Sequence, residues 1–336
     1  MIRKAGQSTD DGQGPRPPRA FPAPIRGSIR WLLRGWSHIP RAHGYLYHIV
    51  EEWGERLATK PLLGYLANGA TMRCDLGDSM QRQIYFLGAY EPIETYLFPL
   101  LLRPGMVVVD AGAHIGQYTL LAALEVGALG AVHAFEPVPK NFDQLTFHIR
   151  ENRLPSIVHA NMLALWQETG TLQLTLSAEQ PRNPGAYTAG LSSSSVDSVT
   201  CKAVSLDSYV SENHIARVDV IKMDIEGAEW FALKGAREVL ERWHPTILME
   251  LSRPTCSGLG YQPERVLDFM KSFGYQMWVI GTSPSECRHM LTPPAVDFAN
   301  VIFHTDPLPD AIVAGWSLRS VRAANARRVR RQPPLL

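Results

Sequence analysis

Two acidic residues end two apolar segments in the stretch VVVDAGAHIGQYTLLAALEVGALGAVHAFEP, residues 107–137. Asp110 ends the first segment, Glu136 ends the second, and the loop after Asp110 contains Gly112 and Gly116. A small-residue loop that leads from a strand into a helix presents backbone N–H groups to an anion or a carboxylate. A carboxylate at the end of the next strand has two acceptor oxygens, enough for both hydroxyls of a ribose. The stretch therefore predicts a nucleoside-binding site.

The loop departs from the dinucleotide-binding pattern G-x-G-x-x-G. Aligned from Gly112, the second and third glycine positions are occupied by His114 and Gln117. The second glycine normally lets the backbone approach a pyrophosphate, which the His114 side chain would obstruct. This disfavours an NAD-dependent oxidoreductase and favours S-adenosylmethionine, a nucleoside ligand without a pyrophosphate. An ordinary strand-to-helix turn would explain the glycines alone, but not Glu136 at the end of the following segment.

A second group of ionisable residues alternates along VDVIKMDIEGAEW, residues 218–230. Lys222, Asp224 and Glu226 point the same way if this segment is a regular strand. Three buried charges are costly unless they serve a site, and the carboxyl end of a strand faces the ligand crevice. We expect Asp224, and secondly Glu226, to be the general base for an acceptor hydroxyl, with Lys222 holding a carboxylate ionised. The alternative is a salt-bridged strand end with Glu226 capping the next helix; Glu229 is expected on the helix surface.

Apolar β-branched segments alternate with helix-length segments from residue 105 onward. This alternation predicts a parallel sheet with helices on both faces. The link 281–299 has three prolines and no clear helix, which favours an antiparallel last strand. The expected strands are 106–110, 131–135, 157–160, 218–225, 246–251, 275–280 and 300–304, with additional strands at 170–176 and 199–204, and the expected helices are 116–126, 139–152, 228–242 and 262–273.

Glu250 ends the segment expected to be the fifth strand and should face the same crevice, in a structural or a substrate-binding role. With Asp224 and Glu226 it would offer enough oxygen ligands for a divalent metal that activates the hydroxyl. Direct transfer without a metal is preferred, so no metal ligand is predicted. The Ser-rich segment 187–198 is either part of the acceptor site or a surface loop, and the surface loop is preferred.

Four segments, in this order, resemble the FkbM-type S-adenosylmethionine-dependent methyltransferases: VVVDAGAHIGQYTLLAA, AFEPVPKNF, VSLDSY and IKMDIEGAEWFALKGA, with GAYEP (88–92) just upstream. The resemblance covers roughly residues 85–255. It implies a class I methyltransferase, Rossmann-like three-layer α/β sandwich, with a seven-stranded, mostly parallel sheet and an antiparallel last strand. It also implies O-methylation of a small-molecule or glycan hydroxyl, typically on a sugar or a polyketide-like compound.

The resemblance also implies roles for single residues. It places the segment from Asp110 to Gly116, with Gly112 and His114, beside the methionine part of S-adenosylmethionine, and Glu136 beside the ribose. It places Asp224 and Glu226 near the acceptor. On the resemblance alone, Tyr90 and Glu91 close over the cofactor, on the substrate side. The family more often has Asn in place of His114; an imidazole can also donate one hydrogen bond, with a pH dependence.

The alternatives to O-methylation are methyl transfer to nucleic acid or another nitrogen acceptor, and a non-catalytic S-adenosylmethionine-binding module. A methyltransferase acting on nucleic acid would use the basic chain ends. Adenine methyltransferases resemble one another in an Asn-Pro-Pro-Tyr type sequence at the end of the fourth strand, where this chain has MDIE, so nucleic acid is disfavoured. A non-catalytic S-adenosylmethionine-binding module would be indicated by a degenerate cofactor loop, and this loop keeps its acids and glycines.

The whole chain of 336 residues is 45% hydrophobic and 19% charged, as in globular proteins. We find no run of about 18 uncharged apolar residues and no signal peptide, and the four cysteines are far apart, so a cytoplasmic location without a transmembrane segment is expected. We expect a disordered Pro/Arg-rich tail over 1–25, a helical lead-in over 26–84, the methyltransferase domain over 85–306 and a basic, solvated tail over 307–336. Nothing in the sequence specifies an oligomeric state.

Overall fold

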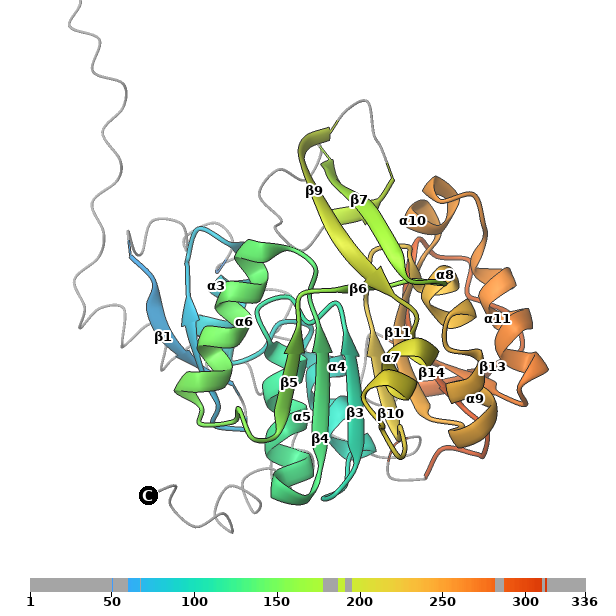
Figure 1. Ribbon diagram of the computed structural model, residues 1–336, viewed down its shortest axis with the longest axis horizontal. Coiled ribbons are helices and arrows are strands. Elements are labelled where there is room, and N and C mark those ends of the chain that lie inside the picture. Colours follow the sequence, from blue (N-terminus) through green and yellow to red (C-terminus); the bar gives the residue numbers. More distant parts are fainter. Residues whose placement is uncertain are drawn as a thin grey trace, which may run out of the picture.

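The computed structural model describes residues 60–66, 68–177, 187–190, 195–281 and 287–309, together with Val50 and Ile312 (Figure 1). The tail expected over 1–25 and nearly all of the tail expected over 307–336 lie outside the described residues. No helix in the described part of the chain is long and apolar enough to cross a membrane.

An eight-stranded sheet in the order β13-β12-β14-β11-β10-β3-β4-β5 forms the centre of the described chain. The strands from β11 to β5 in this order pair in parallel, whereas β14 pairs antiparallel with both β11 and β12. The seven expected strands and the antiparallel last one are therefore confirmed. The strands are β3 (Val107–Ala111), β4 (Ala131–Phe135), β5 (Val158–Asn161), β10 (Val220–Met223), β11 (Thr246–Ser252), β12 (Gln276–Ile280) and β14 (Phe298–His304).

An additional edge strand, β13 (Cys287–Met290), lies in the link 281–299 and pairs antiparallel with β12. It makes the sheet one strand wider than expected. The sequence did not predict β13, because this four-residue edge strand has exposed Arg288 and His289 and therefore no apolar pattern typical of a strand.

Neighbouring residues of the central strands face two different apolar clusters. Val108 of β3 belongs to one cluster with Leu121 and Leu145, and Val109 belongs to the other with Leu233. Side chains that alternate between two buried faces explain the continuous apolar segments in the sequence. The three-layer α/β class is therefore confirmed. Helices α5 (Gln117–Val126) and α6 (Pro139–Glu151) supply the first cluster, and α7 (Leu206–Glu212), α8 (Glu229–Lys234), α9 (Arg237–Trp243) and α11 (Pro263–Ser272) supply the second.

The helix expected over 228–242 is divided into α8 and α9 at Gly235. A Cβ atom on Gly235 would lie 2.2 Å from the backbone oxygen of Trp166, so the chain can pass this close only with glycine. Helix α10 (Arg253–Gly258) follows β11 directly.

The described part of segment 26–84 differs from the helical lead-in that the sequence suggested. Strands β1 (Leu62–Tyr65) and β2 (Thr71–Cys74) form an antiparallel hairpin, and α3 (Ser79–Leu87) follows. The connecting turn contains Asn68 and Gly69, with φ +94° at the glycine. Asn-Gly between apolar segments favours a hairpin, and it is the local signal for these two strands. Helix α4 (Pro92–Leu97) and the short 3₁₀ helix η2 (Phe98–Leu101) then lead to β3.

A separate four-stranded sheet, in the order β6-β9-β7-β8, stands above the upper ends of β3, β4 and β5 in Figure 1. It consists of β6 (Ala164–Leu165), β7 (Gly170–Ser177), β8 (Tyr187–Ala189) and β9 (Ser195–Val204). The two additional strands expected at 170–176 and 199–204 are confirmed. The Ser-rich segment 187–198 supplies β8 and the start of β9, and its residues 191–194 lie outside the described chain.

Candidate functional site

The candidate site lies at the carboxyl ends of β3 and β10, where the order of strands along the chain reverses. Ligands of open α/β sheets bind at such a switch point. Lys222 on β10 is aligned with Asp110 on β3, and Glu136 directly follows the neighbouring strand β4. Glu250 is on β11, on the other side of β10. The structure therefore brings together the residues that the sequence placed at strand ends.

Gly112 lets the loop after β3 pass against the end of β10. Its φ is +78°, and a Cβ atom at this position would lie 1.9 Å from the backbone oxygen of Asp224. The N–H groups of Gly112 and Ala113 donate to the backbone oxygen of Phe135, at 3.0 and 2.9 Å. No side chain fits between the two segments, which explains the glycine physically.

Gly116 precedes the first turn of α5, with φ +101°. The next residue, Gln117, is buried and holds the turn at Tyr90 through the backbone. Its Oε1 accepts from the Tyr90 N–H at 2.9 Å, and its Nε2 donates to the Tyr90 oxygen at 3.1 Å. Sequence reasoning treated Gln117 only as a missing glycine. The available signal was a polar residue at the start of an otherwise apolar helix.

Glu136 is buried and accepts two backbone hydrogen bonds. Its Oε2 accepts from the His114 N–H at 2.8 Å, and its Oε1 accepts from the Val138 N–H at 2.9 Å. Burial raises the pKa of Glu136 to about 7, although these hydrogen bonds lower it. Oε1 also accepts from Asn141 Nδ2 at 3.4 Å. A carboxylate oxygen has two lone pairs, so Oε2 keeps a position for a further donor such as a hydroxyl.

His114 has one ring nitrogen paired and one without a partner. Its Nδ1 lies 3.0 Å from the thioether sulfur of Met80 on α3. A thioether only accepts, so this contact assigns the ring proton to Nδ1 and leaves Nε2 as an acceptor. Nε2 is buried and has no hydrogen-bond partner among the described residues. A buried acceptor left unpaired costs about 1–3 kcal/mol, which a donor on a ligand would offset.

Burial also lowers the pKa of His114 to about 4, although the nearby Asp224 raises it. The imidazole is therefore neutral at neutral pH. The pH dependence that the sequence suggested for His114 is accordingly shifted to acidic pH.

One cavity of about 70 Å³ is lined by Gly112 and His114 of the loop after β3, by Glu136, and by the candidate bases Asp224 and Glu226. Its remaining walls are largely apolar and come from β6, β7 and the residues beside them. Ligand cavities are usually about 300 Å³ or larger, so the walls must separate to admit a whole nucleoside. The residues of this cavity that the sequence predicted are Gly112, His114, Glu136, Asp224 and Glu226.

Lys222 is fully buried beneath the candidate bases. Its ammonium lies 3.3 Å from Oδ2 of Asp224 and 4.8 Å from the ring centre of Tyr118. Burial lowers the pKa of Lys222, but the carboxyl groups of Asp224, Glu91 and others outweigh it and raise the pKa above its usual value. Lys222 therefore remains an ammonium in the folded protein.

The glutamates around this ammonium hold their protons more tightly than usual. Burial, together with the charge of Asp224, raises the pKa of Glu226 to about 8, that of Glu250 to about 9 and that of Glu91 to about 7. Asp110, buried beneath them, accepts a 2.5 Å hydrogen bond from the Thr119 hydroxyl, and burial raises its pKa to about 6.

The segment 218–230 is less regular than expected. Strand β10 ends at Met223, and Glu226 has φ +54°, so the simple alternation of sides does not extend to Glu226. Glu229 is buried rather than on the helix surface, and that expectation was wrong. Its Oε1 accepts from the N–H groups of Ile225 and Gly227, at 3.0 and 3.3 Å, because the turn before α8 needs an acceptor there.

Tyr90 and Glu91 lie beside this cluster. Glu91 has φ +46° before α4, and its Oε2 accepts from the Tyr118 hydroxyl at 3.2 Å. Burial and the charge of Glu91 raise the pKa of Tyr90. Asn300, aligned with Glu250, donates to Glu94 at 2.9 Å. Tyr118, Glu94 and Asn300 were not predicted, since only the packed fold brings them to this edge.

Among the described residues, no group of three or more His, Cys, Asp or Glu side chains has an arrangement that could hold a metal ion.

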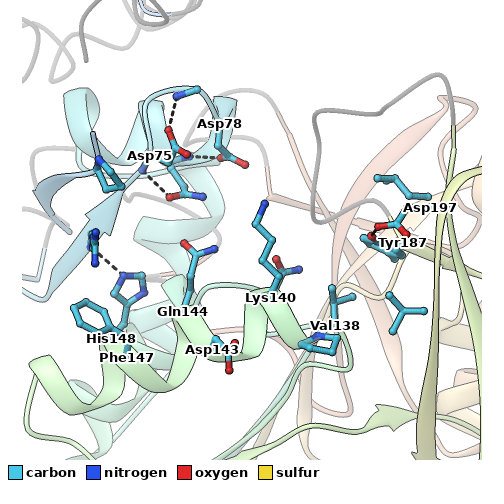
Figure 2. A pocket seen from close by; sticks show the side chains of 18 residues that line it. Asp75, Asp78, Val138, Lys140, Asp143, Gln144, Phe147, His148, Tyr187 and Asp197 are labelled. Atoms are coloured by element: carbon cyan, nitrogen blue, oxygen red, sulfur yellow. Dashed lines mark hydrogen bonds between the residues drawn. The ribbon is translucent and has the colours of Figure 1, made fainter. Parts of the chain in front are cut away.

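A larger groove of about 1160 Å³ adjoins the cavity (Figure 2). Its walls are the β1–β2 hairpin with the start of α3, the exposed face of α6, and the four-stranded sheet. Val138 and Tyr187 line both the groove and the cavity, so the two are adjacent.

The chain is similar in sequence to known methyltransferases. The family model described as "Methyltransferase FkbM domain" matches residues 110–277, half of the chain. The chain is 28% identical to the "31-O-demethyl-FK506 methyltransferase FkbM" of Streptomyces tacrolimicus, over 41% of this chain and 62% of that protein. It is 30% identical to the "Hexuronic acid methyltransferase AglP" of Haloferax volcanii, over 40% of this chain and 52% of that protein. The chain thus spans about half to two thirds of the length of these relatives.

A solved structure of an FkbM methyltransferase from Methylobacillus flagellatus is 17% identical, with a TM-score of 0.38. The similarity covers 67% of this chain and 54% of that one.

Proposed function

Because this chain belongs to the family of the FkbM methyltransferase domain, we propose that it transfers a methyl group from S-adenosylmethionine to a hydroxyl oxygen of a sugar-like or polyketide-like acceptor. The observation that carries the proposal is the unpartnered, buried Nε2 of His114. It lines the same cavity as Glu136 and the candidate base Asp224.

The residues present fit S-adenosylmethionine. Bound there, it supplies an electrophilic methyl carbon on a sulfonium. The loop from Asp110 to Gly116 is proposed to lie beside the methionine end, and the open position on Oε2 of Glu136 accepts a ribose hydroxyl. His114 Nε2 accepts from the ammonium of the methionine end, which gives the buried nitrogen its missing partner.

Asp224 is the proposed general base and Glu226 the second choice. The buried ammonium of Lys222, 3.3 Å from Asp224, balances the charge of that carboxylate. The pKa of Glu226, raised to about 8, leaves it largely protonated at neutral pH and therefore unsuited to accept a proton there. Asp224 thus removes the hydroxyl proton during or after attack on the methyl carbon, and the site contributes proximity and alignment.

Tyr90, Glu91 and Glu250 are proposed to face the acceptor. The turn at Tyr90 is fixed by Gln117, so it can shield the reacting atoms from water. The pKa of Glu250, raised to about 9, keeps its carboxyl protonated at neutral pH and able to donate to an acceptor oxygen.

The test compares Asp224→Asn with Glu226→Gln. Transfer of a labelled methyl group to a panel of sugar and polyketide hydroxyls is measured at pH 7 and pH 9. We expect Asp224→Asn to lower kcat by about 10²–10⁴, the usual contribution of a general base, and Glu226→Gln to keep most activity at pH 7. An equal loss in both variants at pH 7 would remove Asp224 from this role. Label found only on nitrogen acceptors would overturn O-methylation.

A further inference from the structure

The groove beside the cavity has a floor made by one exposed face of α6. Lys140 lies three residues before Asp143 and four before Gln144, and Phe147 lies four and three residues after them; residues at these spacings are neighbours on a helix surface. From Lys140 to Phe147 this face extends about 10 Å, at 1.5 Å per residue. The opposite side of α6 is packed in the core through Leu145. The groove floor is therefore rigid.

Several polar groups of this floor are available to a ligand. The side-chain ends of Lys140, Asp143 and Gln144 make no hydrogen bond or ion pair with other residues of the described chain. Figure 2 shows Lys140 extending into the space between the two walls. Phe147 is 40% exposed, and the guanidinium of Arg73 lies 5.9 Å from its ring centre. An exposed aromatic ring beside unpaired polar groups suits a ligand with apolar C–H faces and many hydroxyls.

The facing walls add acceptors. Asp75 and Asp78 each use one oxygen to hold a backbone N–H, those of Gly77 and Gln81. Across the groove, the Tyr187 hydroxyl donates to Asp197 at 2.5 Å. Both walls are thus held in place by hydrogen bonds of their own and keep further acceptor positions free.

The charge of the groove selects among ligand classes. Four carboxylates, those of Asp75, Asp78, Asp143 and Asp197, stand against the two cations Arg73 and Lys140. An excess of acid disfavours a polyanion such as nucleic acid, whose binding depends on cations. A hydroxyl both donates and accepts, so a neutral chain of sugars can satisfy the carboxylates, the amide and the ammonium together.

We propose that this groove binds a neutral oligosaccharide, with its end entering the cavity that Asp224 lines. Val138 and Tyr187, which line both spaces, mark the passage between them. This inference rests on the proposed methyl transfer to a hydroxyl and specifies the acceptor as a chain of several sugar units rather than a single one. The hairpin and the start of α3, which form one wall, lie outside residues 110–277.

Calorimetry on the full chain tests the groove with cellotetraose, maltotetraose and chitotetraose, and with glucose and N-acetylglucosamine as single units. We expect at least one tetrasaccharide to bind more tightly than its single unit. Phe147→Ala and Lys140→Ala should each weaken that binding about tenfold, equivalent to about 1.4 kcal/mol. The control Phe298→Ala, a residue that is 60% exposed on β14, should leave it unchanged.

S-adenosylmethionine is titrated into the same proteins, and both groove variants should bind it as the wild type does, which also shows that they are folded. If no tetrasaccharide binds, or if both groove variants bind it as the wild type does, the groove inference is overturned while the cofactor result stands. If the groove variants weaken tetrasaccharide binding but the protein does not bind S-adenosylmethionine, the groove inference is supported and the proposed methyl transfer is overturned.

Discussion

Replacing Lys222 with Met removes a buried cation from a group of carboxyls. The carboxyl groups of Asp224, Glu91, Asp110 and Glu250 all lie close enough to raise the pKa of this ammonium when they are ionised. At 3.3 Å from Asp224, the Coulomb attraction is about 5 kcal/mol at an effective dielectric constant of about 20, and desolvation offsets part of it. Breaking a buried ion pair by removing one partner typically costs about 3–5 kcal/mol. We expect Lys222→Met to lose this much unfolding free energy at pH 8.

The loss should shrink at pH 5. The pKa of Glu91 is about 7 and that of Asp110 about 6, so at pH 5 both are largely protonated and need no neighbouring cation. Urea unfolding at pH 5 and pH 8 measures the difference, with Lys202→Met on the exposed side of β9 as a control. A loss below about 1 kcal/mol at pH 8, or an equal loss at both pH values, would refute the reasoning about buried charge.

Three further predictions each have their own measurement. Gly112→Ala and Gly69→Ala both place a side chain at positive φ, which costs about 1–2 kcal/mol each, but only at Gly112 would the new Cβ lie 1.9 Å from a backbone oxygen. Urea unfolding should therefore show a clearly larger loss of unfolding free energy for Gly112→Ala. Equal losses in the two variants would contradict this reason for the glycine. Burial raises the pKa of Glu250 from 4.5 to about 9, so the folded state binds the proton more tightly and stability falls as pH rises from about 4.5 to about 9. The melting temperatures at pH 6 and pH 9 should therefore differ less in Glu250→Gln than in the wild type. The same difference in both proteins would count against a raised pKa of Glu250. Met80→Leu removes the acceptor of the Nδ1 proton of His114, so ¹⁵N NMR should show more of the Nε2–H tautomer. S-adenosylmethionine should then bind about fivefold more weakly. An unchanged tautomer would disprove the assignment of the ring proton to Nδ1.

The central sheet and the cofactor side of the site could be predicted because their signals are local. Strands buried on both faces favour mostly apolar segments, as at 107–111 and 131–135, and the acids near their ends are visible as Asp110 and Glu136. Gly112 was also predictable as a special backbone position. The physical reason for this glycine is the contact with the backbone of Asp224. That contact could not be predicted, because Asp224 is more than a hundred residues away in the sequence.

The rest depends on packing between distant segments. Glu229 was expected on the helix surface, yet it is buried because its carboxylate accepts a hydrogen bond from the backbone of the turn before α8. Gln117 and Tyr118 hold residues from the α3–α4 turn, a pairing that no spacing in the sequence reveals. The raised pKa of Glu226, which makes it the weaker candidate for a base at neutral pH, arises from burial and from the charge of Asp224, which act only in the folded chain.

The measurement that tests the central claim most directly is calorimetric titration of S-adenosylmethionine, and of NAD, into the wild type and Glu136→Ala. We expect S-adenosylmethionine to bind the wild type, NAD not to bind, and Glu136→Ala to weaken the binding of S-adenosylmethionine at least about tenfold because the ribose loses an acceptor. Circular dichroism confirms that the variant is folded. Failure of S-adenosylmethionine to bind folded wild type, or equal binding by wild type and Glu136→Ala, would contradict the account.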